Sequence, residues 1–139
     1  MVPKNKILLV DDDEDFRRLL AKKIEREFPD YKVSKASDGM SGLQKLNSEP
    51  FNLMILDVSM PIVDGFEVLV HMRRNPNIAN TPVVMCTANS TKDDVIKILQ
   101  MGVIGYIVKS IEIEKMMNRL KELILKVENT TTKLVTKSV

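Results

Sequence analysis

Residues 6–20 read KILLVDDDEDFRRLL, a stretch that joins an apolar run, an acidic turn and a helical pattern. Ile7 to Val10 is continuously apolar, as expected for a strand that is buried on both faces. The acidic residues that follow favour a helix N-terminus, and apolar side chains then recur at helical spacing from Phe16 to Ile24. The stretch therefore predicts a strand that leads into a helix, the repeating unit of parallel sheets.

The same alternation of apolar run and helical pattern continues along the chain, which predicts a parallel sheet covered by helices on both faces. The predicted strands are Ile7–Val10, Tyr31–Ala36, Leu53–Leu56, Val83–Cys86 and Ile104–Val108. The first predicted helix ends before Pro29, and the others are Met40–Asn47, Phe66–Arg74, Lys92–Met101 and Glu112–Val127. Because Tyr31–Ala36 alternates apolar and polar residues, we expect it to be an edge strand.

Length and composition limit the possible classes of protein. The chain has 139 residues, enough for one domain, and 44% of them are hydrophobic. Its formal net charge of +2 is too small to predict direct nucleic-acid binding. The sequence has a single cysteine, Cys86, and it shows neither a signal-like segment nor an apolar run of membrane-spanning length. These features together predict a cytoplasmic protein without membrane attachment. Cys86 itself is expected to be a buried structural residue.

The last twelve positions differ in composition from the rest. Residues 128–139 are rich in threonine and poor in apolar side chains. A segment of that composition cannot bury enough surface to fold alone. We therefore expect a domain over residues 1–127 and a tail or the start of a linker over residues 128–139.

Polar residues collect where the predicted strands end. Asp11 and Asp12 follow the first strand, Asp57 the third, Thr87 the fourth and Lys109 the fifth. The carboxyl ends of parallel strands meet at one edge of the sheet, which is where such folds bind ligands. Three carboxylates crowded together need a counterion, and Mg²⁺ with its preference for oxygen ligands is the leading candidate. A lysine and a hydroxyl nearby would suit an oxyanion held beside the metal.

Four stretches, in this order and spacing, resemble the receiver domain of two-component response regulators. They read KILLVDDDEDFRRLL, LMILDVSMPIVDGFEVL, TPVVMCTA and GVIGYIVKS, and the resemblance as a whole extends over roughly residues 5–127, about nine tenths of the chain. The resemblance implies a flavodoxin-like, doubly wound α/β fold with five helices and five parallel strands in the order 2-1-3-4-5. It also implies a signalling phosphoacceptor, with self-phosphorylation and self-dephosphorylation as its only reactions.

By this resemblance, Asp57 is the phosphoacceptor, which takes a phosphoryl group from phosphohistidine. Asp12 and Asp57 would bind Mg²⁺ directly, Asp11 through water, and the backbone carbonyl of Ser59 would complete the protein ligands. Thr87 would donate a hydrogen bond to the phosphoryl group, which a hydroxyl can do.

The remaining roles concern the switch and the partners. Lys109 would pair with the phosphoryl group, and Tyr106 matches the aromatic switch residue that turns inward with Thr87. Met60, Pro61 and Gly65 match the loop after the phosphoacceptor. The implied partners are a sensor histidine kinase or phosphotransfer protein, and a downstream effector that binds the fourth helix, fifth strand and fifth helix. The implied assembly is a monomer or a phosphorylation-dependent dimer.

One residue departs from the family pattern. Ser110 follows Lys109 where the family usually has proline after a cis peptide bond. A cis bond before a residue other than proline costs about 2.5–4 kcal/mol, so the sequence leaves cis and trans open at Lys109–Ser110.

Other interpretations stay open at this point. Asp13 is expected to cap the first helix, Thr87 alone could cap a following helix, and His71 is expected to have an ordinary surface or packing role. A receiver-like interaction module without phosphate is one alternative. An aspartyl-phosphate-forming hydrolase is another, although Ser59 stands where a second aspartate would be expected. A flavin or nucleotide carrier would need phosphate-binding glycines that are missing after the first strand.

Overall fold

The computed structural model describes residues 5–88, 91–109 and 112–138, with side chains as far as Thr130. Five parallel strands form one sheet in the order β2-β1-β3-β4-β5, which confirms the predicted flavodoxin-like topology. The edge position predicted for β2 is also confirmed. The strands are β1 (Asn5–Val10), β2 (Tyr31–Ala36), β3 (Leu53–Asp57), β4 (Val83–Thr87) and β5 (Gly105–Val108).

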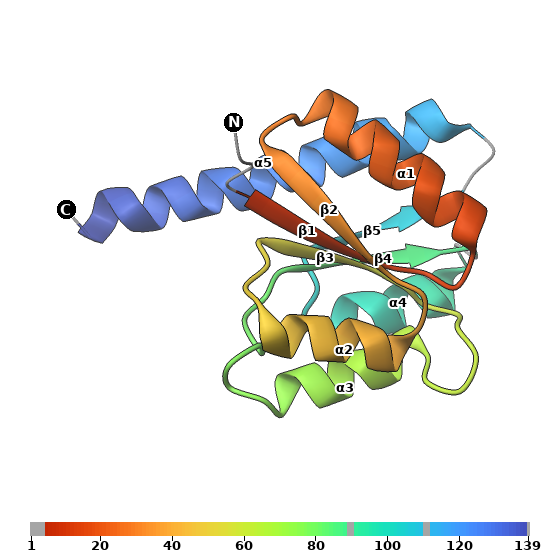
Figure 1. Ribbon diagram of the computed structural model, residues 1–139. Coiled ribbons are helices and arrows are strands. Elements are labelled where there is room, and N and C mark those ends of the chain that lie inside the picture. The colour runs from red at the N-terminus through yellow and green to blue at the C-terminus, as the bar shows by residue number, and fades with distance from the viewer. Residues whose placement is uncertain (1–4, 89–90, 110–111, 139) are drawn as a thin grey trace.

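Helices cover both faces of the sheet (Figure 1). Helices α1 and α5 lie on one face, and α2, α3 and α4 lie on the other. Their bounds are α1 (Glu14–Glu27), α2 (Gly39–Ser48), α3 (Gly65–Arg73), α4 (Lys92–Gln100) and α5 (Ile113–Ser138). Every predicted helix is therefore present, and four of the five end within two residues of the prediction.

The core has two layers because side chains alternate across the strands. On β1, Ile7 and Leu9 join the layer under α1 and α5, whereas Leu8 and Val10 join the layer under α2, α3 and α4. All four are almost completely buried. Burial of such a side chain contributes about 1.5–3 kcal/mol, so the two layers supply the free energy that offsets the polar groups of the site.

Side-chain caps fix where the helices begin. Asp13 caps α1 as predicted, since its Oδ1 accepts a hydrogen bond from the Phe16 amide at 3.1 Å. Asp64 caps α3 and forms a reciprocal capping box with Glu67. The cap of α4 is Thr91, so the alternative that Thr87 caps this helix is wrong.

The prediction that the last helix ends near Val127 is wrong, because α5 continues to Ser138. Neither proline nor glycine interrupts residues 113–138, and an established helix gains one backbone hydrogen bond for each residue added. The Tyr31 hydroxyl on β2 donates to Glu128 Oε1 at 2.8 Å, just beyond the predicted end. Figure 1 shows the helix passing beyond the sheet.

No helix in the described part of the chain is long and apolar enough to cross a bilayer.

The loop between β3 and α3 returns tightly against the strand that it leaves. The Gly65 amide donates to the Val58 carbonyl at 2.9 Å, and a Cβ at residue 65 would collide with the carbonyl oxygen of Asp57. Within the loop, Ile62 has a φ of 69° and is 96% exposed. That conformation is unusual for a β-branched residue, which shows how closely the loop is constrained.

We expect Gly65→Ala to lower the free energy of unfolding by about 1–3 kcal/mol, because the added methyl group must displace the end of β3. Urea denaturation measures the loss, and amide NMR shifts at Asp57 and Val58 report the displacement. Gly102→Ala is the matched control. Gly102 has a φ of 73°, and a methyl group added there would have no neighbouring heavy atom nearer than 3.8 Å, so this variant should lose stability without shifting Asp57. Unchanged shifts at Asp57 in Gly65→Ala would contradict the expectation.

Candidate functional site

The strand register brings the predicted site residues to one edge of the sheet. Val10 pairs with Leu56, so Asp11 and Asp57 follow at the same level on neighbouring strands. Asp57 pairs with Cys86, and the next residue, Thr87, pairs with Val108. Lys109 follows immediately, and its amide donates to the Thr87 carbonyl at 2.8 Å. Residues that are far apart in sequence therefore meet at the carboxyl ends of four strands.

Two of the carboxylates at this edge are buried. Asp11 is completely buried and Asp57 is 3% exposed, whereas Asp12 is exposed. The Asp13 amide donates to Asp11 Oδ1 at 2.9 Å, and the Ser59 amide donates to Asp57 Oδ1 at 3.4 Å. Each buried carboxylate thus has one oxygen oriented by a backbone amide two residues later in the chain.

Lys109 lies between the two buried carboxylates. Its Nζ is 2.8 Å from Asp11 Oδ2 and 3.4 Å from Asp57 Oδ2. Burial favours the neutral amine, but the hydrogen bond to Asp11 and the charges of both aspartates outweigh it and raise the pKa of Lys109. The ammonium also lies 4.8 Å from the ring centroid of Phe16, where a cation–π contact restricts it further.

Burial, with the nearby charge of Asp11, raises the pKa of Asp57 from its ordinary value of 3.8 to about 6, despite the opposing effect of Lys109. One ammonium is therefore too little positive charge to compensate both carboxylates.

The same edge contains Cys86, whose thiol pKa is raised by burial. Cys86 is buried as predicted.

The acidic residues fit a divalent cation. Asp11, Asp12 and Asp57 each offer a carboxylate oxygen, and these oxygens lie within 4.8 Å of one another. Apart from the ammonium of Lys109, the buried Oδ2 atoms of Asp11 and Asp57 have no hydrogen-bond partner among the described residues. Hard oxygen donors with unsatisfied negative charge are the ligands that Mg²⁺ prefers.

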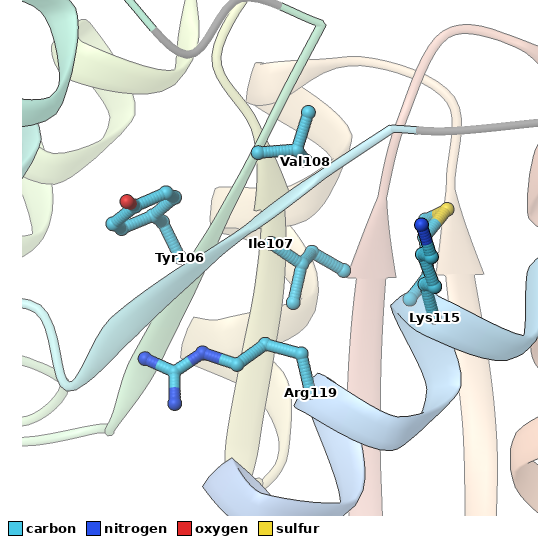
Figure 2. Close-up of a pocket in the computed structure, with 6 residues that line it drawn as sticks. Tyr106, Ile107, Val108, Lys115 and Arg119 are labelled. Atoms are coloured by element: carbon cyan, nitrogen blue, oxygen red, sulfur yellow. The ribbon is translucent and has the colours of Figure 1, made fainter. Parts of the chain in front are cut away.

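Thr87 and Tyr106 lie on the same face of the sheet. Met85 pairs with Tyr106 and Thr87 with Val108, and both Met85 and Tyr106 belong to the layer under α4. Thr87 is 4% exposed, and Tyr106 is half-buried. Figure 2 shows Tyr106 on the opposite side of β5 from Ile107, which points toward α5. The two predicted switch residues are therefore neighbours across two adjacent strands.

Two residues at the site were not predicted to act there. Arg17 donates from its guanidinium to the Asp11 carbonyl at 2.6 Å, and Phe16 provides the ring beside Lys109. Both belong to the first turn of α1, and the only sequence signal was their closeness to the acidic turn. His71 is exposed on α3 and does not belong to the group of acidic residues that could hold a metal ion. Ser110 lies outside the described residues, so the peptide bond between it and Lys109 stays undecided.

Comparison with known proteins gives a family match. The family model of the response regulator receiver domain matches residues 7–121. The response regulator ArlR of Staphylococcus saprophyticus is 33% identical over 119 residues, which are 86% of this chain and 52% of that protein. The chain thus spans about half the length of the first curated relatives that it matches.

Solved structures agree with this match. The chemotaxis protein CheY4 of Vibrio cholerae superposes with a TM-score of 0.76 at 28% identity, over 86% of this chain and 98% of that chain. The response regulator TrrA of Thermotoga maritima, in complex with Mg²⁺ and BeF, superposes with a TM-score of 0.70 at 29% identity, over 86% and 98% of the two chains.

The raised pKa of Asp57 predicts a stability effect that depends on pH. Above pH about 6 the folded protein carries a charged, buried carboxylate, whereas below pH about 4 the group is protonated in both the folded and unfolded states. We therefore expect Asp57→Asn, in chelator at pH 7.5, to raise the free energy of unfolding by about 1–3 kcal/mol. The gain should disappear below pH about 4.

Urea denaturation at both pH values measures this difference. Asp12→Asn is the matched comparison, because it removes a carboxylate of the same cluster whose side chain is exposed, and it should raise the free energy of unfolding less than Asp57→Asn does. Added Mg²⁺ should stabilise the wild type more than Asp57→Asn. An Asp57→Asn variant that is less stable than the wild type at pH 7.5 in chelator would contradict the charge balance described above.

Proposed function

The chain belongs to the response regulator receiver domain family, and from this premise we propose that it accepts a phosphoryl group on Asp57 from a histidine phosphodonor and thereby changes partner binding. The observation that carries the proposal is the buried Asp57 carboxylate, which shares one ammonium with Asp11. Its charge is only partly compensated, so a further cation and a phosphoryl group can be accommodated there.

The proposed reaction uses the carboxylate of Asp57 as a nucleophile. One oxygen attacks the phosphorus of a phosphohistidine, the phosphorus–nitrogen bond breaks, and the histidine ring leaves with the bonding electrons and takes up a proton. The product is an acyl phosphate on Asp57. The Ser59 amide and Lys109 each contact one oxygen of this carboxylate, at 3.4 Å in both cases, and so orient its plane before the reaction.

The proposed direct ligands of Mg²⁺ are Asp12, Asp57 and the backbone carbonyl of Ser59, and Asp11 is proposed to bind the ion through water. Mg²⁺ bound there would neutralise negative charge on the phosphoryl group during transfer. The three carboxylates supply the negative charge that retains the ion, and two of them are already oriented by backbone amides. The structure of the response regulator TrrA in complex with Mg²⁺ and BeF supports Mg²⁺ as the ion.

Lys109 and Thr87 are proposed to hold the transferred group. Lys109 lies 3.4 Å from Asp57 and is paired with Asp11, so its ammonium can contact a phosphoryl oxygen after small movement. Thr87 ends β4 at the same edge and can donate its hydroxyl proton to a second oxygen. Each new contact forms only in the phosphorylated state, which is what a switch requires.

The output surface is proposed to comprise α4, β5 and α5. A surface pocket of about 520 Å³ lies along the edge strand β5 and the start of α5, lined by Tyr106, Ile107, Val108, Lys115, Met116 and Arg119 (Figure 2). If Thr87 moves toward the phosphoryl group, Tyr106 on the neighbouring strand gains room to move inward, and this surface changes. The proposed partners are a sensor histidine kinase or phosphotransfer protein and a downstream effector, in the cytoplasm.

Intact-mass spectrometry after incubation with acetyl phosphate tests the proposal. We expect the wild type to gain one phosphoryl group in Mg²⁺ and none in chelator, because the uncompensated carboxylates repel the donor. Asp57→Asn should gain none in either condition. Asp64→Asn, which removes a carboxylate of the adjacent loop, is the control and should still be phosphorylated.

Full phosphorylation of Asp57→Asn would overturn the assignment of the acceptor. No phosphorylation of the wild type by acetyl phosphate, nor by a panel of phosphorylated histidine kinases, would instead favour a receiver-like interaction module without phosphate. Sustained release of phosphate from a generic phosphomonoester would favour a hydrolase.

We expect Thr87→Ala to separate phosphorylation from switching. With Mg²⁺ and beryllofluoride, amide NMR shifts should change at both Asp57 and Tyr106 in the wild type. In Thr87→Ala the changes at Asp57 should persist, and those at Tyr106 should fall severalfold, because the hydroxyl that connects the two sites is missing. Equal changes at Tyr106 in both proteins would show that Thr87 does not transmit the signal.

A further inference from the structure

A second polar pocket lies at the same edge of the sheet, where the first turns of α1 meet the end of β2, and β1 separates β2 from the strand that carries Asp57. Its volume is about 250 Å³, and its lining residues are Glu14, Arg17, Arg18, Lys35 and Ser37. Three of these side chains are cationic and one is anionic. The cavity is thus positively charged, although it adjoins the most acidic stretch of the chain, residues 11–15.

The charges of this cavity are not balanced internally. Glu14 pairs with Arg18 at 2.9 Å, and both side chains are exposed. Arg17 donates to the backbone carbonyl of Asp11, which carries no formal charge. Across the described residues, no carboxylate lies within ion-pair distance of either Arg17 or Lys35. Two positive charges therefore remain without an ionic partner.

The fold brings these two cationic residues to the same pocket. Lys35 follows Tyr31 and Val33 on the side of β2 that faces α1, but unlike them it is exposed. It therefore stands at the carboxyl end of the strand, beyond the apolar cover that α1 provides. Arg17 is partly buried, and its 2.6 Å hydrogen bond fixes the guanidinium against the loop that carries Asp11 and Asp12.

We propose that this cavity is an oxyanion-binding subsite, which receives a carboxylate or phosphate group of the phosphodonor while Asp57 receives the phosphoryl group. The planar guanidinium of Arg17 matches either oxyanion, and Lys35 adds a second charge. The Ser37 hydroxyl can donate a further hydrogen bond. The inference rests on the proposed function for its biological meaning, but the binding itself does not require phosphorylation.

The subsite would also offset the repulsion between an anionic phosphodonor and the carboxylates of the acidic site. An anionic donor that approaches Asp11, Asp12 and Asp57 is repelled until a cation is bound there. A cationic subsite next to these carboxylates provides an attractive contact at the same edge of the sheet, which raises the rate of encounter and orients the donor.

Amide NMR titration with inorganic phosphate, in chelator and at low ionic strength, tests the binding. Without a metal the acidic site repels phosphate, so we expect the shift changes to be centred on residues 14–18 and 35–37. Lys35→Met should weaken phosphate binding by about fivefold. Lys32→Met is the matched control, because Lys32 is also exposed on β2 but points to the opposite face, and it should bind phosphate like the wild type.

A parallel titration with a tetraglutamate peptide separates the two possible sources of the oxyanion. Saturable shifts with the peptide would assign the subsite to carboxylates of a protein phosphodonor, and saturable shifts with phosphate alone would assign it to a phosphate group. Shifts with neither probe, or equal weakening by Lys32→Met and Lys35→Met, would overturn the inference.

A phosphorylation assay with acetyl phosphate tests the proposed function independently of anion binding at the subsite. Acetyl phosphate has no second anionic group, so Lys35→Met should be phosphorylated at a rate within about twofold of the wild type. If wild-type Asp57 is phosphorylated while neither probe binds, only the subsite fails. If a probe binds while Asp57 is never phosphorylated, the proposed function fails and the anion-binding site stands.

Discussion

Two buried carboxylates that share a single ammonium form the constraint on which the rest of the structure depends. Asp11 and Asp57 lie at the same level on adjacent strands, and Lys109 is within 3.4 Å of both. This arrangement leaves net negative charge in a region of low polarity, which is unfavourable for folding. It is nevertheless useful chemically, because the uncompensated oxygens are available for a cation and for a phosphoryl group.

The surrounding fold offsets this unfavourable charge and keeps the carboxylates in place. The two apolar layers on either side of the sheet supply most of the stabilising free energy. Short contacts then position the site itself: Gly65 lets the β3–α3 loop pass against Asp57, and Arg17 ties the start of α1 to Asp11. Stability and site geometry are therefore coupled at residues such as Gly65, which contacts the end of β3 directly.

The sequence predicted the strand ends well and the details of the site less well. Apolar runs followed by Asp11, Asp57, Thr87 and Lys109 were enough to place these residues at one edge, since parallel strands all end there. The length of α5 was predicted wrongly, because a threonine-rich composition was given more weight than the absence of a proline or glycine stop. The contacts of Arg17 and Phe16 could not be predicted, since they depend on how the first turn of α1 is oriented over the loop.

The helices differ in how many residues they bury, and the low burial of α4 is relevant to signalling. Of the nine residues of α4, only Ile98 is fully buried, whereas α2 and α3 each bury four. Exposed contacts at its C-terminal end supplement this anchor: Lys97 in the last turn lies 4.1 Å from the ring centroid of Phe66, and Arg73 donates to the carbonyl of Gly102, just after the helix, at 3.0 Å. A helix held by one apolar side chain and a few exposed contacts can be shifted by a small free energy. In the proposed phosphorylated state, two or three new hydrogen bonds at Asp57 would each contribute about 1.5–3 kcal/mol, because they involve charged groups. A free energy of that size would be enough to shift α4, which buries fewer residues than α2 or α3.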